Sequence, residues 1–334
     1  MAVRETVELS QIMAGAVLAR AMCIVGDLGI ADLIERGQSR PASELAAAAE
    51  CDPRSLYRTM RFLASYRIFE ETEPGRFALT PLAEALRSDA DGSFRPAARM
   101  FARLFVGLQE FEHSLRTGES GLTKALGEPL FSFLANDPEM AAIFDAAMTS
   151  FHGPETPAVL DAYDLSGLGT LADIGGGNGS LLIAALNRHA NLNGLLFDLG
   201  HVAGRAREHV RAAGLEERCR IEGGNFFESI PPGAGAYLFR HIIHDWSDEQ
   251  AVRILENCRA AIPADGRLLV VETVVPAGNE ASPAKDMDIQ MLIYPGGMER
   301  TEDEYRELFR AAGFEMTGVT STASPVSIIE GRPV

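Results

Sequence analysis

The second half of the chain alternates short apolar stretches with segments whose apolar residues follow helical spacing. We predict the apolar stretches to be strands, at Thr170–Ile174, Gly194–Asp198, Arg220–Glu222, Ala236–Arg240 and Arg267–Val275. Alternation of this kind is typical of a doubly wound α/β sheet with parallel strands, whose ligands bind at the carboxyl ends of the strands. Residues 314–331 predict a closing antiparallel pair.

Residues 1–100 show a different pattern, of short helices followed by one hairpin. We expect Asp52 to cap a helix that begins at Pro53, and Phe69–Glu71 to pair with Arg76–Leu79 across a Glu-Pro-Gly turn. Helix, helix and β-wing in this order are typical of a winged-helix domain. The following pattern stays helical and rich in Phe, which favours a connector packed over a pocket. We therefore predict three regions, which are residues 1–100, 101–165 and 166–334.

The most apolar segment of the chain is Ile12–Ile34, which is interrupted by Arg20, Asp27 and Asp32. These charges disfavour a membrane span, and the first residues lack the charged-then-apolar pattern of a signal peptide. We therefore expect a buried helix pair in a cytoplasmic protein. Because the segment is apolar on most of its circumference, either its own domain or a second subunit has to cover it.

The charge balance narrows the classes of ligand. The 334-residue chain has 30 basic and 47 acidic residues and a net charge of −17, which disfavours a phosphate-binding surface and suits neutral or cationic ligands. A winged helix can bind DNA, and Arg54, Arg58 and Arg61 share one helical face, so a ligand-sensing DNA-binding regulator is an alternative. Residues 1–100 contain more acidic than basic residues, however, which argues against it. The four cysteines are scattered, without the spacing of a metal site or a disulfide framework.

The stretch Leu171–Gly179 reads Leu-Ala-Asp-Ile-Gly-Gly-Gly-Asn-Gly and leads from a strand into a predicted helix. Gly175 and Gly177 let the backbone approach a nucleotide-like ligand closely. A dinucleotide fingerprint requires a third glycine or alanine where Ser180 stands. Asp173 would repel a pyrophosphate, but it suits the ammonium group of a methionine-like ligand.

The ends of the next two strands carry residues suited to a nucleoside. Asp198 ends the second strand, where a carboxylate can accept hydrogen bonds from both ribose hydroxyls, and Leu199 lies beside it. After the third strand, Asn225 offers an amide to the edge of an adenine ring and Phe226 offers a face for stacking. Taken alone, Asp198 is also compatible with a turn residue, and residues 222–227 with an ordinary loop.

The stretch 240–250 reads Arg-His-Ile-Ile-His-Asp-Trp-Ser-Asp-Glu-Gln and is the most informative one. Ser247 and Gln250 predict a capping box, so a helix is expected to begin at Asp248 and His244 to lie on the loop that leaves a strand. Methyl transfer to oxygen requires removal of the hydroxyl proton, and a phenol with a pKa near 10 is mostly protonated at neutral pH. A histidine that titrates near pH 6.5 is the natural general base.

A catalytic histidine needs an orienting partner. Glu272 ends a predicted strand, and Glu299 precedes a predicted capping box of Thr301 and Glu304, so both occupy positions suited to the same cleft. Glutamates at such positions are also common on protein surfaces, and spacing alone leaves both interpretations open.

Together these residues resemble the plant-type small-molecule O-methyltransferase family, which includes caffeate, flavonoid and acetylserotonin methyltransferases and bacterial antibiotic-tailoring relatives. The resemblance covers essentially the whole chain, through RSLYRTMRFLASYRIFEE, RFALTPLAEALR, LADIGGGNGS, FDLGHV, GGNFF, HDWSDEQAVRILENC, VVETVVP and GGMERTEDEYRELFRAAGF. It implies a Rossmann-like class I methyltransferase fold that binds S-adenosylmethionine in residues 166–334. It also implies a homodimer that is formed by a winged-helix dimerisation domain, residues 1–100. Residues 101–165 would form a helical connector over the acceptor pocket.

The resemblance also assigns roles to individual residues. Carried over by position, the cofactor contacts fall on Gly175, Asp198, Asn225, Phe226 and Arg240, the base on His244, and its partners on Glu272 and Glu299. The acceptor, a small aromatic or polyketide-like hydroxyl compound, is expected to contact Met148, Asp245, Met287, Met291 and Tyr294. No metal, nucleic acid or membrane partner is implied.

Three positions depart from the residues usual in the family. Asn225 stands in place of Asp, Gly200 in place of a proline, and His241 where many plant members carry a tryptophan beside the cofactor. His241 is compatible with a packing role, a substrate contact or a second base. A family member with altered chemistry, such as a decarboxylase or a hydroxylase, is a further alternative. The intact base and its two glutamates argue against it, because drift would be expected first in the base.

Overall fold

The computed structural model of the protein describes residues 2–334. By its internal contacts the chain divides into two compact units, Met1–Val106 with Leu134–Phe151, and Gly107–Phe133 with His152–Val334. The region predicted as one helical connector, 101–165, is therefore shared between the two units.

The first unit is made of short helices and a small sheet. Its elements are α1 (Ala2–Asp27), a 3-10 helix (Ile30–Leu33), β1 (Ser39–Pro41), α2 (Ala42–Ala48), α3 (Pro53–Ser65), β2 (Phe69–Glu73), β3 (Arg76–Leu79), α4 (Pro81–Glu84), α5 (Arg95–Leu104) and most of α10 (Pro138–His152). Asp52 caps α3 as predicted, because its carboxylate accepts the N–H of Ser55 at 2.8 Å. The predicted hairpin of β2 and β3 is present, and β1 extends it into an antiparallel sheet in the order β1-β3-β2.

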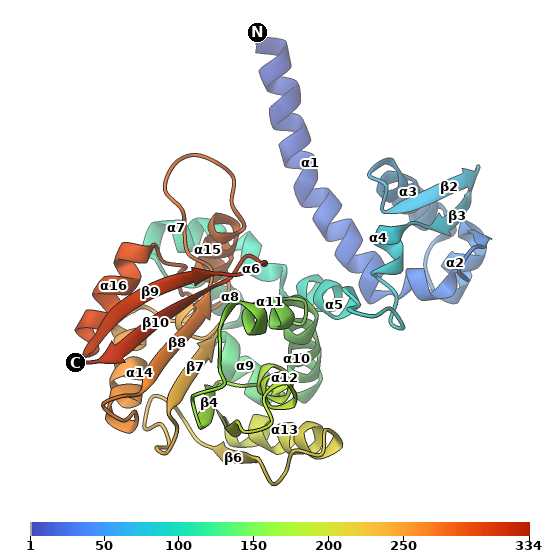
Figure 1. The fold of residues 1–334 in the computed structure, drawn as a ribbon. Helices are drawn as coiled ribbons and strands as arrows, with labels where there is room; N and C mark the ends of the chain where they lie inside the picture. The colour runs from blue at the N-terminus through green and yellow to red at the C-terminus, as the bar shows by residue number, and fades with distance from the viewer. Residues whose placement is uncertain (1) are drawn as a thin grey trace. The chain divides into compact units, whose positions relative to one another are not determined.

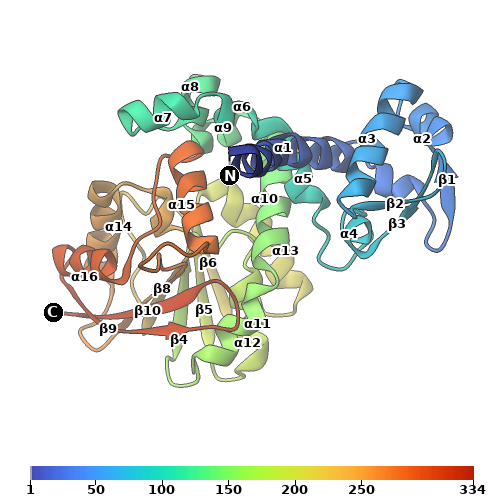
Figure 2. The same cartoon turned by 90° about the horizontal axis from the view of Figure 1, so that it is seen from above.

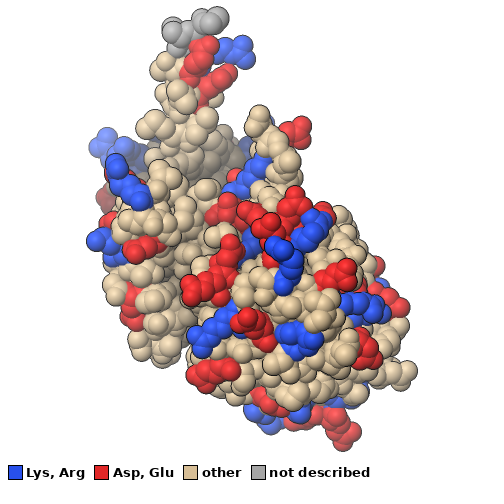
Figure 3. All heavy atoms as spheres, turned by 90° about the vertical axis from the view of Figure 1, so that its left-hand side faces the viewer, with Lys and Arg blue, Asp and Glu red and all other residues tan. Residues whose placement is uncertain are grey.

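Helix α1 and the 3-10 helix that follows it form the two helical elements predicted within Ile12–Ile34, but the expectation that both are buried is wrong for the first half of α1. Its second half packs in the core of the first unit, where Val25 is buried. Its first half extends away from α2–α4 (Figures 1 and 2), and its apolar side chains are exposed, to 73% for Ile12 and 75% for Met13. Beyond the few acidic and basic side chains near its start, such as Arg4 and Glu8, the described part of this half is drawn in tan in the view of Figure 3. By length and composition alone, α1 is also apolar enough to span a membrane.

The second unit combines a large sheet with helices. Its strands are β4 (Thr170–Ile174), β5 (Asn193–Asp198), β6 (Cys219–Gly223), β7 (Ala236–Arg240), β8 (Arg267–Glu272), β9 (Phe314–Ser321) and β10 (Ser327–Pro333). Its helices are α7 (Phe111–Thr117), α8 (Gly121–Leu126), α11 (Glu155–Ala162), α12 (Ser180–Arg188), α13 (Gly200–Ala212), α14 (Asp248–Ala261), α15 (Pro283–Ile293) and α16 (Glu302–Ala311). The chain passes between the units within α6 (Val106–Gln109), within α9 (Leu130–Asn136) and at the end of α10.

The large sheet has the order β6-β5-β4-β7-β8-β10-β9. Strands β6, β5, β4, β7 and β8 are parallel and β10 and β9 are antiparallel to their neighbours, which confirms the doubly wound sheet and its closing pair. Strand β8 ends at Glu272 and not at Val275, because Val274 pairs with Arg300 outside the strands. From β4 the chain moves to β5 and β6 on one side and then to β7 on the other, so the switch point of this sheet lies between β4 and β7.

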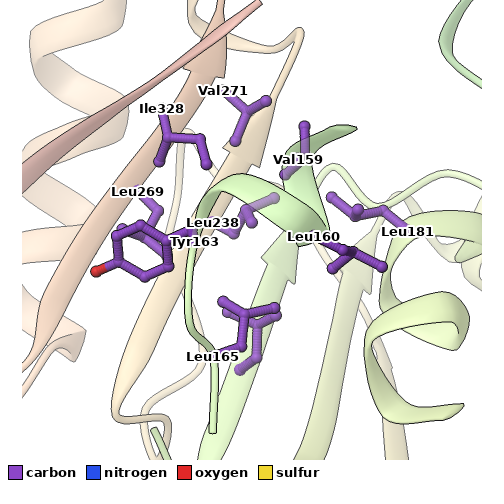
Figure 4. A pocket seen from close by; sticks show the side chains of 10 residues that line it. Val159, Leu160, Tyr163, Leu165, Leu181, Leu238, Leu269, Val271 and Ile328 are labelled. Atoms are coloured by element: carbon purple, nitrogen blue, oxygen red, sulfur yellow. The ribbon is translucent and has the colours of Figure 1, made fainter. Parts of the chain in front are cut away.

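Helices cover both faces of the large sheet (Figure 1). Buried side chains of α14 and α16 form one core with the sheet, and those of α11, α12 and α13 form a second core on the opposite face. The second core encloses a small gap between α11, α12 and the sheet, lined by apolar side chains such as Leu160, Leu181 and Leu238 (Figure 4). At about 10 Å³ it has room for about one water molecule, so it is a packing gap and not a ligand site.

Candidate active site

The glycine loop after β4 lies at the switch point and has the backbone that a close ligand requires. Gly175 has φ +69°, a conformation that strains other residues, and a Cβ there would lie 2.3 Å from Cδ1 of Ile242, so a larger residue would have to displace this side chain. Gly177 has φ +58° with no atoms within 4 Å of a Cβ position, so the space beside it is open. Both glycines were predicted from the sequence to bind the cofactor, and this arrangement fits that role.

Asp198 links the glycine loop to the end of β5. Its Oδ2 accepts the N–H of Gly177 at 2.8 Å, and its Oδ1 accepts the N–H of Leu199 at 2.7 Å. The carboxylate is only partly buried, and Leu199 is 41% exposed beside it. The two backbone donors therefore orient the Asp198 carboxylate at the end of β5. Its contact with a ribose stays a prediction.

Asp173 and Arg240 lie at the carboxyl ends of the adjacent strands β4 and β7. Burial raises the pKa of Asp173 to about 6, and the charge of Arg240 opposes this shift. Burial lowers the pKa of Arg240, while Asp173 favours its charged form. The Arg240 guanidinium donates to Oγ1 of Thr156 at 3.0 Å and to Oγ of Ser180 at 3.4 Å. These contacts hold Arg240 beside the glycine loop, with Asp173 on the adjacent strand. One basic and one acidic group here fit the predicted binding of a zwitterionic amino-acid ligand.

Asn225 and Phe226 follow β6, as predicted. Oδ1 of Asn225 accepts the N–H of Phe227 at 3.0 Å, so part of its hydrogen-bonding capacity is used within its own turn. The ring of Phe226 lies 6.0 Å from that of Trp246 in an edge-on arrangement and is partly buried. Their predicted contacts with adenine stay predictions.

His244 lies in a 3-10 turn (Ile243–Asp245) directly after β7 and is buried. Its Nδ1 is 2.6 Å from Oε1 of Glu299, and its Nε2 is 3.7 Å from Oδ1 of Asp245. Burial lowers the pKa of His244, but the hydrogen bond to Glu299 and the nearby charges of Asp245 and Glu272 outweigh it and leave the pKa raised to about 10. The expectation that this histidine titrates near pH 6.5 is therefore wrong, because carboxyl groups surround the imidazole.

Glu272 does not contact the imidazole ring. Its Oε1 accepts the backbone N–H groups of Ile242, Ile243 and His244 at 3.1, 2.6 and 3.1 Å, and its Oε2 accepts the hydroxyl of Tyr305 at 2.5 Å. Of the two glutamates expected beside His244, only Glu299 therefore binds the ring. Glu272 holds the backbone of the turn that carries it.

A second histidine cluster, not predicted from the sequence, lies beside this turn. Oε2 of Glu155 is 2.8 Å from Nε2 of His241 and 3.3 Å from Nδ1 of His152. The two imidazoles are stacked with their centroids 3.8 Å apart, and the ring of His241 lies 5.2 Å from that of His244. Burial lowers the pKa of His241 to about 3, so this ring is neutral at pH 7. Ligand atoms of the three residues lie within 4.8 Å of one another, close enough for a metal ion, and the expectation of no metal stays a prediction.

The residues predicted to contact the acceptor lie on α10, on α15 and in the turn that carries His244. Met287 and Met291 are half-buried on α15, and Tyr294 is buried at the end of this helix, where its carbonyl accepts the hydroxyl of Ser120 at 2.6 Å. Met148 is half-buried on α10 in the first unit. Asp245 lies beside His244, and burial raises the pKa of its carboxyl group to about 7. The contacts of all five with an acceptor stay predictions.

A doubly wound sheet with an open glycine loop, an acidic residue on the next strand and a buried histidine–glutamate pair defines a class I methyltransferase. The chain matches the O-methyltransferase domain over residues 109–315 and the O-methyltransferase dimerisation domain over residues 10–89. It therefore belongs to the O-methyltransferase family, and it is an S-adenosylmethionine-dependent O-methyltransferase. The family and the fold class expected from the sequence are confirmed.

Individual relatives match over nearly the whole chain. Phenazine O-methyltransferase PhzM of Lysobacter antibioticus is 40% identical over 327 residues, which cover 98% of this chain and 96% of the relative. The crystal structure of LaPhzM matches with a TM-score of 0.94 and 40% identity over 98% of this chain and 99% of that one. NcsB1, an O-methyltransferase from neocarzinostatin biosynthesis crystallised with S-adenosylmethionine and 2-hydroxy-5-methyl naphthoic acid, matches with a TM-score of 0.85 and 34% identity over 95% and 96% of the two chains.

We expect Asp198→Asn to weaken S-adenosylmethionine binding about tenfold, because one charged acceptor becomes a neutral amide. The amide keeps only one acceptor oxygen for the two backbone donors, Gly177 and Leu199, so one of these hydrogen bonds is lost as well and adds to the effect. Calorimetric titration measures the affinity, and Asp164→Asn, at an exposed turn of the same unit, is the matched control. An unchanged affinity in Asp198→Asn would reject the ribose contact.

Proposed function

We propose that this protein transfers a methyl group from S-adenosylmethionine to a hydroxyl group of a small aromatic natural product, with His244 as the general base. The observation that carries this proposal is the buried His244–Glu299 pair, whose Nδ1–Oε1 distance is 2.6 Å, directly after β7 and next to the glycine loop. Ligands of such sheets bind at this edge, so cofactor and acceptor meet close to the imidazole.

The residues around the base suit a proton transfer from a phenol. Nδ1 of His244 is held by Glu299, which leaves Nε2 to take the hydroxyl proton of the acceptor as its O–H bond breaks. Glu299 then stabilises the imidazolium that forms. A pKa of about 10 for His244 is close to that of a phenol, so the proton moves between groups of similar basicity. The cofactor supplies the electrophilic methyl group on its sulfonium.

The residues near the glycine loop suit the cofactor. The backbone at Gly175 and Gly177 allows a close approach, Asp198 offers a carboxylate to the ribose, and Asp173 and Arg240 offer opposite charges to the amino-acid end. We assign cofactor binding to these residues, with Leu199, Asn225 and Phe226 at the nucleoside.

The relatives support a proposal for the acceptor. A phenazine and a hydroxynaphthoic acid are named for two of them, so we expect a planar aromatic hydroxyl compound. Incubation with methyl-deuterated S-adenosylmethionine and a panel of hydroxyphenazines, hydroxynaphthoates and simple phenols, followed by mass spectrometry, tests this. The matched methoxy compounds, which have no free hydroxyl, are the controls. Label on the methoxy controls, or on none of the phenols, would contradict O-methylation of an aromatic hydroxyl.

We also propose that the protein is a cytoplasmic homodimer formed through its first unit. The exposed apolar half of α1, with Ile12, Met13 and Val17 at 73%, 75% and 62% exposure, lies within the match to the dimerisation domain. Apolar surface of this extent is typical of an obligate interface, and a second copy covers it without a membrane.

The expected result is a dimer in sedimentation velocity at micromolar concentration. We expect Ile12→Glu to shift the protein toward the monomer, because a charge on the apolar face costs several kcal/mol when buried. Leu115→Glu, at an exposed leucine of the second unit, is the control and should leave the dimer intact. A wild-type monomer would overturn the assignment.

A further inference from the structure

Charged side chains bind both the backbone N–H groups and the backbone carbonyls of the turn that carries His244. The carboxylate of Glu272 takes the N–H groups of residues 242–244. On the carbonyl side, Nη1 of Arg300 donates to Ile243 at 3.3 Å and Nη2 donates to Trp246 at 3.0 Å. A single guanidinium therefore joins the two ends of the turn, with His244 between them.

Arg300 is buried to an unusual degree for a cation. It has 0% exposure, and the described charge that pairs with it is Asp248, whose carboxylate lies 2.9 Å from Nε and 2.9 Å from Nη2. Asp248 is the first residue of α14 and its side chain is 69% exposed. Burying a guanidinium is costly unless its donors are satisfied. The planar fork of arginine satisfies them here with a carboxylate and three carbonyls, those of Ile243, Trp246 and Met298.

The same short segment also holds the imidazole ring. The N–H of Met298 donates to the carbonyl of His244 at 2.9 Å, and the carboxylate of Glu299 binds the ring of His244. Gly297 permits this close approach, since a Cβ there would lie 2.0 Å from the carbonyl oxygen of His244. The consecutive residues 297–300 therefore contact both the backbone of the turn and the imidazole ring of His244.

We propose that Arg300 is a positioning residue for methyl transfer, which fixes the turn so that Nε2 of His244 faces the acceptor hydroxyl. Glu299 fixes only Nδ1 of the ring, and a rotation of the turn would move the imidazole and Glu299 together away from the acceptor. Arg300 prevents this rotation by holding the carbonyls on either side of His244. The inference rests on the proposed role of His244 as base.

The test compares Arg300→Lys with Asp248→Asn in the full-length protein. Lysine keeps the charge and the long apolar stem, but one ammonium on a flexible stem cannot reproduce the planar fork that joins the two carbonyls. We expect kcat to fall about 10- to 100-fold, with KM for the acceptor and Kd for S-adenosylmethionine within about twofold. Asp248→Asn keeps the carbonyl contacts and is expected to change kcat less than threefold.

A second readout separates positioning from folding. If Arg300 acts through the base, the loss of kcat in Arg300→Lys becomes smaller for acceptors whose hydroxyl ionises without help, such as nitrophenols. A loss of equal size for all acceptors, an unchanged kcat, or a variant that does not fold would assign Arg300 to stability alone and overturn the proposal. His244→Ala, measured in parallel, distinguishes failure of the proposed base from failure of the positioning role. Full activity of His244→Ala rejects the base. A loss of activity in His244→Ala together with wild-type activity of Arg300→Lys rejects only the positioning role.

Discussion

Replacing His244 by alanine is expected to lower kcat at pH 7, but by less than the roughly 10²- to 10⁴-fold typical of a general base, because a pKa of about 10 leaves most of His244 protonated at this pH. The affinity for S-adenosylmethionine should stay within about twofold of the wild type, because we assign contact with the acceptor to the imidazole and contact with the cofactor to the glycine loop. Initial rates with an acceptor found in the label-transfer screen measure the first quantity, and calorimetric titration measures the second.

The control for this loss is a histidine outside the site. His113, on α7, contacts Glu119 at 3.3 Å, and His113→Ala should leave kcat within about twofold. The rate of His244→Ala should also rise with pH, because a phenol that ionises by itself near pH 10 no longer needs a base. Full activity of His244→Ala at pH 7 would show that orientation of the acceptor suffices for transfer.

The second large effect is expected for Glu299→Gln, which should lower the maximal kcat about 100-fold. The amide can still accept the Nδ1–H of His244, but it no longer stabilises the imidazolium that forms when the acceptor loses its proton. Burial lowers the pKa of His244, and the hydrogen bond to the Glu299 carboxylate is the largest of the effects that raise it. Removing this carboxylate therefore lowers the pKa of His244.

The direction of the pH dependence follows from this shift. Below its pKa, His244 is protonated and cannot accept a proton, so kcat/KM of the wild type should rise with pH toward a plateau near pH 10. In Glu299→Gln the same rise should occur at lower pH and reach a lower plateau. Measured profiles that level off at the same pH in both proteins would contradict the coupling of Glu299 to His244.

The sequence predicts most of the fold because the signals are local. Alternating apolar and amphipathic segments gave strands β4 to β7 nearly to the residue, and the capping boxes at Ser247 and Thr301 form as predicted. Helix α1 was predicted less well, because a helix that is apolar on most sides does not reveal whether its own chain covers it.

The site was predicted in its residue types but not in its contacts. Glu272 and Glu299 are both strand-end or loop glutamates in sequence, and only the fold shows that one binds backbone and the other the imidazole. Glu155 gave no signal, because it begins α11 far from β7 along the chain. Arg300 was missed because arginines are usually exposed and nothing in its neighbours indicates burial.

The raised pKa of His244 was also beyond the sequence. A histidine in isolation titrates near pH 6.5, and burial alone would lower this value. The reversal comes from carboxyl groups on three different segments, those of Asp245, Glu272 and Glu299, which the fold brings around one ring. Sequence analysis predicts Glu272 and Glu299 near His244, but spacing along the chain does not give the distances that decide between burial and these charges.

The most direct test of the base is the dependence of the transfer rate on the acidity of the acceptor. Single-turnover rates with labelled S-adenosylmethionine are compared for wild type and His244→Ala over acceptors of similar shape and graded hydroxyl pKa at pH 7. If His244 removes the proton, the rate ratio of wild type to variant should be largest for the least acidic hydroxyl. It should approach one for acceptors that are already ionised. A constant ratio across the series would contradict the role of His244 as the general base.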